Sequence, residues 1–421
     1  MGVAAVAAAV MVGGCPANEG PAPLGFANTD DPSNGGAAFA GSASCALCHA
    51  EIAAEHAAHG HAAALNAAQG RAPTFSPLGE RAGAPDPPAG FDWTDIAYVI
   101  GGYRKGAFFV RADGFIATNG VDGVDSNWQL EFTPGGIAAG FAPYLPNALE
   151  PTPFAFECFR CHTTGALAQS ASEPAFQDGR AGILGTWSEA GVQCEACHGP
   201  GGRHFATRDG EVRIDRSAIY VDLTGEQTCR VCHSDGLSDS AKILAEDGFI
   251  RHDQQWAELR ASGGHADFSC GFCHESHRSS TYERSAAIRN DCTACHADTT
   301  MAKHGGAVFV RGDYREEVSC ESCHMPFAAK VSSQADAAAV PAPGRVGDTR
   351  SHIFRIDLTG GDASQFLSDA GDEVRLGTDG RAALTVDYVC LRCHNDVGLP
   401  NLSFTVDRAS EIARFMHIEL P

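Results

Sequence analysis

Lysine is scarce in this sequence, and negative charge dominates it. Only four of the 421 residues are lysine, and 30 Lys and Arg stand against 52 Asp and Glu, which gives a formal net charge of −22. Such a chain repels nucleic acid, so cationic proteins or metal surfaces are better partners than DNA or RNA. Aromatic residues are also few, at 8%, and the apolar run at residues 1–14 is too short to cross a bilayer.

One pattern, Cys-x-x-Cys-His, occurs eight times and uses 16 of the 17 cysteines. It is the attachment signature of c-type haem. Residues i, i+3 and i+4 share one face of a helical turn, so two sulfurs can bond one porphyrin while the imidazole meets the iron as proximal ligand. Zinc knuckles and thioredoxin-like pairs also use Cys-x-x-Cys, but neither needs the following histidine. The sequence therefore predicts eight covalent c-type haems, with iron.

The predicted haem-attaching cysteines are Cys45, Cys48, Cys158, Cys161, Cys194, Cys197, Cys229, Cys232, Cys270, Cys273, Cys292, Cys295, Cys320, Cys323, Cys390 and Cys393. The predicted proximal ligands are His49, His162, His198, His233, His274, His296, His324 and His394.

Eight porphyrins would supply much of the apolar mass that side chains provide in other proteins of this size. This agrees with the low aromatic content and with the 48 glycines and 21 prolines, which favour irregular turns. We therefore expect a mainly α fold with much irregular structure, wrapped around a close-packed chain of haems. Small β insertions are expected near 96–118 and 373–388, where short runs flank Gly-Gly or Asp-Gly turns.

The N-terminus has features of an export signal. Haem is attached to c-type apoproteins outside the cytoplasm, so the chain must be exported, to a periplasmic, outer-membrane-anchored or extracellular location. Residues 1–15 end in Val12-Gly-Gly-Cys15 and resemble a bacterial lipoprotein signal, in which Cys15 would carry lipid and anchor the protein to a membrane. An ordinary cleaved signal is the alternative, and no Lys or Arg precedes the apolar run.

The rest of the chain is expected to fall into four parts: a flexible tether at 16–43, a core with seven haem motifs at 44–327, an Ala/Ser/Pro/Gly-rich linker at 328–348, and a C-terminal haem segment at 349–421. Helices are expected at 44–65, 187–198, 253–261 and 410–417.

Two segments of the sequence resemble segments of the multihaem family of the ammonia-oxidiser tetrahaem cytochrome c and related octahaem cytochromes. In the first, the motif ending at His49 is followed twelve residues later by His61 and Ala-x-Ala-Leu; the second is Cys194-Glu-Ala-Cys-His-Gly-Pro-Gly-x-x-His204. In that family such late histidines bind the iron of a neighbouring haem. The resemblance covers residues 44–325. It implies distal ligand positions at His61, His204, His265 and His277.

Ten histidines lie outside the motifs, whereas two-histidine ligation of every iron needs eight. His56 and His59 are interpreted as solvated helix residues, so the distal candidates are His61, His204, His252, His265, His277, His304, His352 and His417. His277 lies three residues past His274, and a chain of that length spans at most about 10 Å. It is too short to round the porphyrin rim, so His277 serves another haem or none. Met301, Met325 and Met416 are alternative ligands by type, but are interpreted as packing residues.

Two function classes follow. Irons with two histidine ligands have no open position, so they pass electrons and bind no substrate. This predicts an octahaem cytochrome that conducts electrons between a periplasmic or membrane donor and another redox protein or external acceptor. Self-assembly into an oligomer or filament is a variant of this prediction.

The alternative is an octahaem oxidoreductase acting on hydroxylamine, nitrite or tetrathionate at one five-coordinate or lysine-ligated haem, as the resemblance to octahaem enzymes implies. All eight motifs end in histidine, so a lysine in place of a motif histidine is absent. The sequence does not exclude four residues as parts of such a site: Tyr98, Tyr103, Tyr144 and Lys303. No catalytic residue is assigned.

Overall fold

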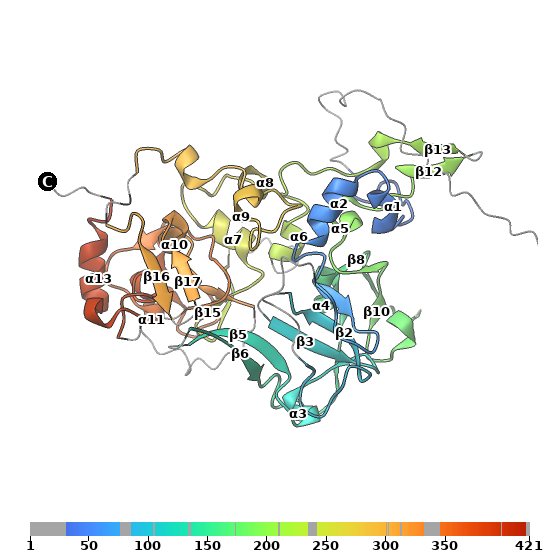
Figure 1. Cartoon of the computed structure of the whole chain (residues 1–421), viewed down its shortest axis with the longest axis horizontal. Helices are drawn as coiled ribbons and strands as arrows, with labels where there is room; N and C mark the ends of the chain where they lie inside the picture. Colours follow the sequence, from blue (N-terminus) through green and yellow to red (C-terminus); the bar gives the residue numbers. More distant parts are fainter. Residues whose placement is uncertain are drawn as a thin grey trace, which may run out of the picture.

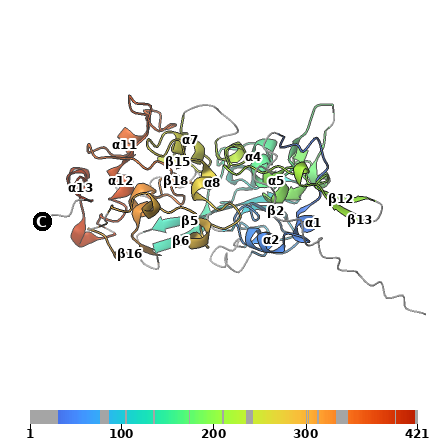
Figure 2. The ribbon, with the colours of Figure 1, turned by 90° about the horizontal axis from the view of Figure 1, so that it is seen from above.

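The computed structural model describes residues 31–75, 86–103, 106–133, 136–172, 174–208, 211–234, 242–299, 301, 303–311, 314–331, 346–396 and 398–417. The molecule is elongated, and its N-terminal and C-terminal halves lie at opposite ends (Figures 1 and 2). The hairpin of β12 (Phe205–Arg208) and β13 (Glu211–Ile214) marks one end, and helix α13 (Val406–Ala413) marks the other. Cys15 and the predicted signal lie outside the described residues.

The helices are short, and none in the described ranges exceeds eight residues. None of these helices has the length and apolar composition needed to cross a membrane. Besides α13, they are α1 (Ser42–Ala46), α2 (Ala50–Ala57), α3 (Asn119–Asp122), α4 (Phe156–His162), α5 (Cys194–His198), α6 (Arg230–His233), α7 (Gln255–Arg260), α8 (Cys270–Cys273), α9 (Arg284–Ala287), α10 (Cys320–His324), α11 (Ala363–Phe366) and α12 (Val386–Val389).

A seven-stranded antiparallel sheet lies in the N-terminal half. Its strands are β1 (Leu65–Ala67), β2 (Ile96–Gly101), β3 (Gly106–Arg111), β4 (Phe115–Ile116), β5 (Asn127–Thr133), β6 (Gly136–Ala142) and β7 (Thr152–Pro153). The predicted insertion near 96–118 is confirmed in β2, β3 and β4, but the sheet is larger than expected.

Six small sheets complete the described strands. The two-stranded antiparallel ones are β8 (Thr163–Thr164) with β11 (Glu189–Ala190), β9 (Leu167–Ala168) with β10 (Gly185–Thr186), β12 with β13, and β16 (Val308–Arg311) with β17 (Tyr314–Glu317). The others are β14 (Ala245–Glu246), β15 (Phe249–Arg251) and β18 (Ala329–Lys330), and the parallel pair β19 (Ile356–Asp357) and β20 (Leu384–Thr385). The irregular character of the fold is as predicted, but strands are as prominent as helices.

Each half has its own hydrophobic core. In the N-terminal half, one face of the sheet buries Ile100 and Phe154, and the other buries Val99 and Phe109. Neighbouring residues alternate between faces, as strand geometry requires. The C-terminal half packs around Tyr388, which is fully buried. Ordinary side-chain cores therefore frame the haem motifs on both sides.

Three of the four predicted helices differ from the structure. The helix expected over 44–65 is broken into α1 and α2, because His49 leaves helical geometry with φ −112° and ψ 43°. The helix expected over 187–198 is confined to α5, because Gly191 adopts φ 80° and ends β11 in a turn. The last helix begins at Val406, where the Thr405 hydroxyl accepts a hydrogen bond from the backbone N–H of Arg408, and it ends before His417. The helix near 253–261 is present as α7.

The hairpin expected at 373–388 is not formed, although a turn is present at Gly377–Gly380. The backbone N–H groups on either side of the turn bond to other segments: Val374 donates to Ile243, and Leu384 donates to Arg355. The segment expected as a linker, 328–348, begins in the buried strand β18 and ends in the buried Val346 and Asp348. Its middle, 332–345, lies outside the described residues.

Candidate haem-binding sites

Every Cys-x-x-Cys-His motif forms a single tight turn. In five motifs the backbone N–H of the histidine donates to the carbonyl of the first cysteine, at 2.9 or 3.0 Å. The other three motifs lie within α4, α5 and α10. This geometry brings both sulfurs and the imidazole to one side of the turn, as attachment to one porphyrin requires.

Six motif histidines lie opposite a histidine from elsewhere in the chain. Metal–imidazole bonds are about 2 Å long, so two imidazoles on opposite sides of one metal ion have ring centres about 6 Å apart. The six pairs have centroid separations of 5.9–6.1 Å: His61 with His233, His198 with His277, His265 with His296, His274 with His352, His304 with His394, and His324 with His417. Each gap has the width that an iron with two imidazole ligands needs.

The two remaining motif histidines also have a histidine neighbour. His49 interacts electrostatically with His204, and His252 does so with His162. Each of the eight motif histidines therefore has at least one of the eight predicted distal histidines near it. The structure brings His277 to His198, which belongs to a different motif from its sequence neighbour His274.

The second ring nitrogen of several imidazoles is already engaged. Nδ1–H groups donate to backbone carbonyl oxygens at 2.8–3.1 Å: His162 to Ala64, His198 to Tyr220, His204 to Asp215, His324 to Phe354, and His394 to Leu402. A proton on Nδ1 leaves Nε2 as the metal-binding nitrogen and fixes the orientation of the ring. These residues therefore fit iron ligation.

A cavity of about 1710 Å³ lies between the first five motifs. All three Cys and His residues of each of the first four motifs line it, together with Cys270 and His274 of the fifth. Sites for one drug-sized ligand measure about 300–1,000 Å³. This cavity is large enough for several flat ligands side by side, so the residues present fit haem in number and in space.

Thiols of neighbouring motifs lie close to one another. Three pairs are within hydrogen-bonding range: Cys45 with Cys194, Cys161 with Cys232, and Cys229 with Cys270. Five further pairs interact electrostatically: Cys197 with Cys229 and with Cys232, Cys273 with Cys295, Cys292 with Cys320, and Cys323 with Cys390. The motifs thus form one series in the order first, third, fourth, fifth, sixth, seventh and eighth, with the second beside the fourth.

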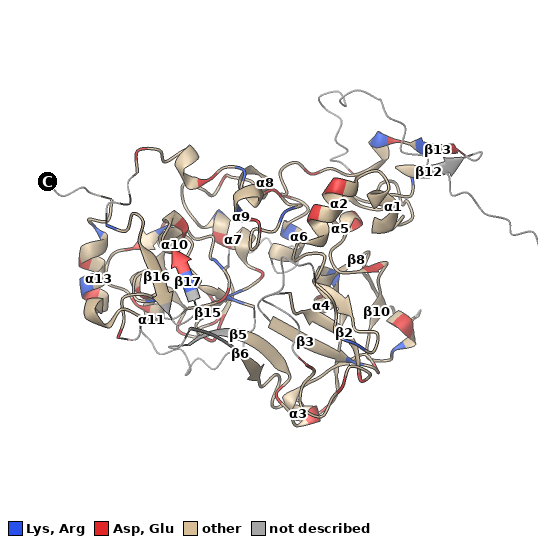
Figure 3. Cartoon of the chain, viewed as in Figure 1, with Lys and Arg blue, Asp and Glu red and all other residues tan. Residues whose placement is uncertain are grey.

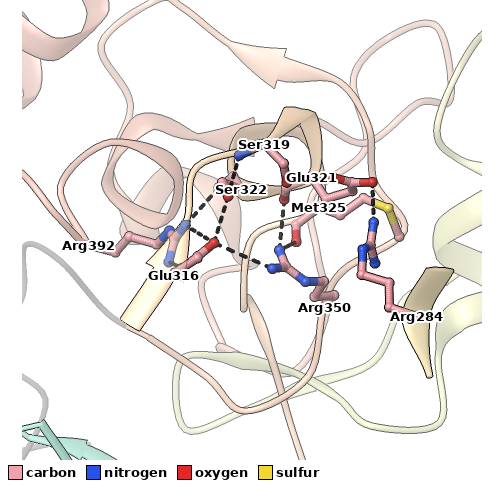
Figure 4. A network of polar contacts seen from close by, with 8 residues as sticks. All are labelled: Arg284, Glu316, Ser319, Glu321, Ser322, Met325, Arg350 and Arg392. Carbon is pink, nitrogen blue, oxygen red and sulfur yellow. Dashed lines mark hydrogen bonds and ion pairs between the residues drawn. The ribbon is translucent and has the colours of Figure 1, made fainter. Parts of the chain in front are cut away.

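A buried ion pair joins the seventh and eighth motifs (Figure 4). The guanidinium of Arg392, inside the eighth motif, donates to both carboxylate oxygens of Glu316 at 2.7 and 2.9 Å, and to the carbonyl of Ser322 inside the seventh. The two charged side chains are only 3% and 6% exposed. Burial alone would raise the pKa of Glu316, but the hydrogen bonds and charge of Arg392 lower it to about 2. The pair is therefore ionised at neutral pH.

The same network extends to the sixth motif. Arg350 donates to the carbonyls of Glu321 and Met325 at 2.9 Å. The Glu321 carboxylate accepts from Arg284 and also contacts the Cys292 thiol, 3.8 Å away. Figure 4 shows these side chains converging around α10. Sequence reasoning missed this cluster, because only Arg392, Glu321 and Ser322 lie inside haem motifs.

His56 and His59, interpreted from the sequence as solvated, are both partly buried. The Nε2–H of His56 donates to the Val192 carbonyl at 2.9 Å, and the His59 ring lies 4.4 Å from that of His61. Burial, with the charge of His56, lowers the pKa of His59 to about 4. The solvated interpretation is therefore wrong. Both residues lie inside the histidine-rich region as neutral neighbours of the paired imidazoles.

The residues left open for an enzymatic site are dispersed. The Tyr98 hydroxyl donates to Asp178, and that of Tyr103 donates to the Ala58 carbonyl. Tyr144 lines the cavity, where burial and the neighbouring Cys158 raise its pKa to about 12. Lys303 is exposed.

Among the methionines, Met416 places its sulfur 3.2 Å from Nδ1 of His304, so it contacts a paired imidazole from the side away from Nε2.

Comparisons with known proteins find likenesses to multihaem cytochromes. The sequence profile of the family described as cytochrome c554 and c-prime matches residues 148–199. The chain is 24% identical over 216 residues to the multihaem cytochrome MtrA of Shewanella baltica (strain OS185), across 49% of this chain and 56% of the relative. The match therefore spans only about half the length of that curated relative.

A solved structure supports the fold. The octahaem sulfite reductase MccA of Wolinella succinogenes is similar with a TM-score of 0.57 and 15% sequence identity, over 89% of this chain and 71% of that one. At this identity the likeness concerns the fold alone. With its eight Cys-x-x-Cys-His turns and paired imidazoles, the chain is similar to multihaem c-type cytochromes.

Proposed function

We propose that this chain is an octahaem c-type cytochrome that conducts electrons in the bacterial cell envelope or extracellular space. The observation that carries the proposal is the pairing of imidazoles. Each motif histidine has a second histidine beside it, and six pairs are spaced for an iron between them. The distal ligands, in order of motif, are His204, His252, His277, His61, His352, His265, His417 and His304.

Bound haem supplies a one-electron redox centre. The protein's part is to close the coordination sphere with the second imidazole, which leaves no position for substrate. Nδ1 hydrogen bonds to backbone carbonyls hold several of the motif imidazoles in place, and one also holds the second imidazole of His204. If the paired histidines held each bound iron from both sides, electron transfer would be favoured over catalysis on a small molecule.

The order of the motifs supports a conduit along the molecule. The first motif begins in α1, near the β12–β13 end, and the eighth motif follows α12 in the half that carries α13 (Figures 1 and 2). Contacts between neighbouring thiols link the series from one end to the other. Electrons would enter and leave at opposite ends, with the second motif as a side branch next to the fourth.

The partners would be other redox proteins: cytochromes, quinol-linked donors or terminal reductases. Charged residues are spread over both halves of the ribbon instead of gathering at one end (Figure 3). The net charge of −22 favours a cationic docking surface on the partner. Export, lipid at Cys15 and assembly into oligomers are part of the proposal. The flexible tether expected at 16–43 is not, because its described part packs against the third motif: Asn34 is 4% exposed, and its side-chain amide donates to the carbonyls of His198 and Pro200.

Protein-film voltammetry tests the conduit function. We expect reversible waves from the holoprotein and no catalytic current when hydroxylamine, nitrite, tetrathionate or sulfite is added, because every iron has two histidine ligands. The His61→Ala variant is the matched control, since its iron beside His233 gains an open position and should bind a small ligand such as CO. A catalytic current from the unaltered protein would overturn the proposal in favour of an oxidoreductase.

A further inference from the structure

One paired imidazole has a charged hydrogen-bond partner. The Nδ1–H of His277 donates to Oε1 of Glu275 at 2.9 Å. The Nδ1 partners identified for other paired imidazoles in the described ranges are neutral: five backbone carbonyls, the amide of Gln255 for His233 at 2.8 Å, and the thioether of Met416 for His304. His277 therefore differs from these seven imidazoles in the charge of its partner.

The carboxylate of Glu275 is held in a defined orientation. Its other oxygen, Oε2, accepts from Nε of Arg289 at 3.0 Å and from Nη2 of the same guanidinium. The backbone N–H of Glu275 donates to the Ala287 carbonyl at 2.8 Å. Each carboxylate oxygen thus has its own partner, and Oε1 stays directed at the imidazole.

An ionised acceptor at Nδ1 makes an imidazole a more basic ligand than a neutral acceptor does. A more basic ligand stabilises the oxidised, more positive iron, and second-shell hydrogen bonding is one of the levers that set haem potentials. We propose that Glu275 gives the iron between His198 and His277 a lower reduction potential than the iron between His61 and His233. This inference rests on the proposed function, since it assumes that His277 is a ligand.

The consequence is a change of reduction potential along the series of haem sites. The motif of His198 lies third in sequence but second in the series, between the first and fourth motifs. A low-potential site there holds an electron only briefly, so electrons that pass it leave rapidly toward whichever neighbour is oxidised. Glu275 is a tuning residue in this account, because it acts on the iron only through His277.

Reciprocal substitutions test the inference. Glu275→Gln keeps the shape and an acceptor oxygen but removes the charge, while Gln255→Glu adds a charge at the corresponding nitrogen of His233. In redox titrations of the holoprotein followed by EPR and optical spectra, we expect Glu275→Gln to raise one potential and Gln255→Glu to lower one. A tenfold change in the electron-transfer equilibrium constant corresponds to about 59 mV for a one-electron couple.

Haem content and spin state separate the outcomes. The tuning role requires that both variants keep eight low-spin haems while one potential moves. Unchanged potentials in Glu275→Gln, or a downward shift, would overturn the tuning role. Loss of low-spin signal in that variant would overturn it as well, because the carboxylate would then only position the imidazole ring of His277. The His277→Ala variant tests the ligation independently. An unaltered spin state in that variant would contradict the proposed assignment of His277 as a ligand. A changed spin state in His277→Ala, with unchanged potentials in Glu275→Gln, would contradict only the tuning role of Glu275.

Discussion

Replacing Arg392 with leucine is expected to lower the free energy of unfolding by about 3–5 kcal/mol, the usual result of removing one partner of a buried ion pair. The substitution leaves Glu316 buried without the guanidinium that donates two hydrogen bonds to it. Denaturant unfolding of the holoprotein, followed by far-UV circular dichroism, measures the change.

Haem attachment itself should survive this substitution. The corresponding position of the other motifs tolerates other side chains, including Leu47, Val231 and Ala294. We therefore expect mass spectrometry to find the same haem content in the variant. The loss would appear only in stability, and in the packing of the seventh motif against the eighth.

An exposed ion pair supplies the matched control. Arg408 and Glu411 on α13 form a bridge at 2.6 Å, but their side chains are 56% and 64% exposed. Arg408→Leu should change the stability by no more than about 0.5 kcal/mol. In addition, Glu316→Gln should recover part of the loss in the Arg392→Leu background, because it removes the uncompensated charge. Equal effects of Arg392→Leu and Arg408→Leu would contradict the role assigned to the network.

Replacing His277 with alanine is expected to convert one haem to the high-spin state, and that haem should be the one attached at Cys194 and Cys197. The reason is the 6.1 Å separation between the rings of His277 and His198. EPR of the oxidised variant should show a new high-spin signal from one haem per chain. His56→Ala is the matched control, since His56 is another partly buried histidine of the same region but is not assigned as a ligand.

The identity of the affected haem follows from a second substitution. In a variant with serine at Cys194 and Cys197, the third haem is not attached, and adding His277→Ala should produce no further high-spin signal. In a variant with serine at Cys270 and Cys273, the effect of His277→Ala should persist. The reverse pattern would mean that His277 serves the haem of its own neighbouring motif, against the reach of the chain.

The sequence predicts the attachment sites because they depend on a local pattern. Cys-x-x-Cys-His needs only one helical turn, and every motif forms that turn. The strands β2 and β3 were predictable for the same reason, since their β-branched and aromatic residues lie between glycines. The set of eight candidate distal histidines came from counting the histidines outside the motifs.

The pairing of ligands could not be predicted, because partners such as His61 and His233, or His274 and His352, come from distant parts of the chain. Helix lengths failed where a local break overrides propensity, as at His49 and Gly191. The hairpin at 373–388 failed because its backbone groups bond to other segments, a choice made by tertiary packing.

The central claim is that each of eight irons has two histidine ligands. It is tested most directly by EPR of the oxidised holoprotein, with spins counted against a haem assay on the same sample. The account predicts eight haems per chain and low-spin signals that account for all of them. A high-spin signal equal to one haem per chain, or a haem count below eight, would contradict it.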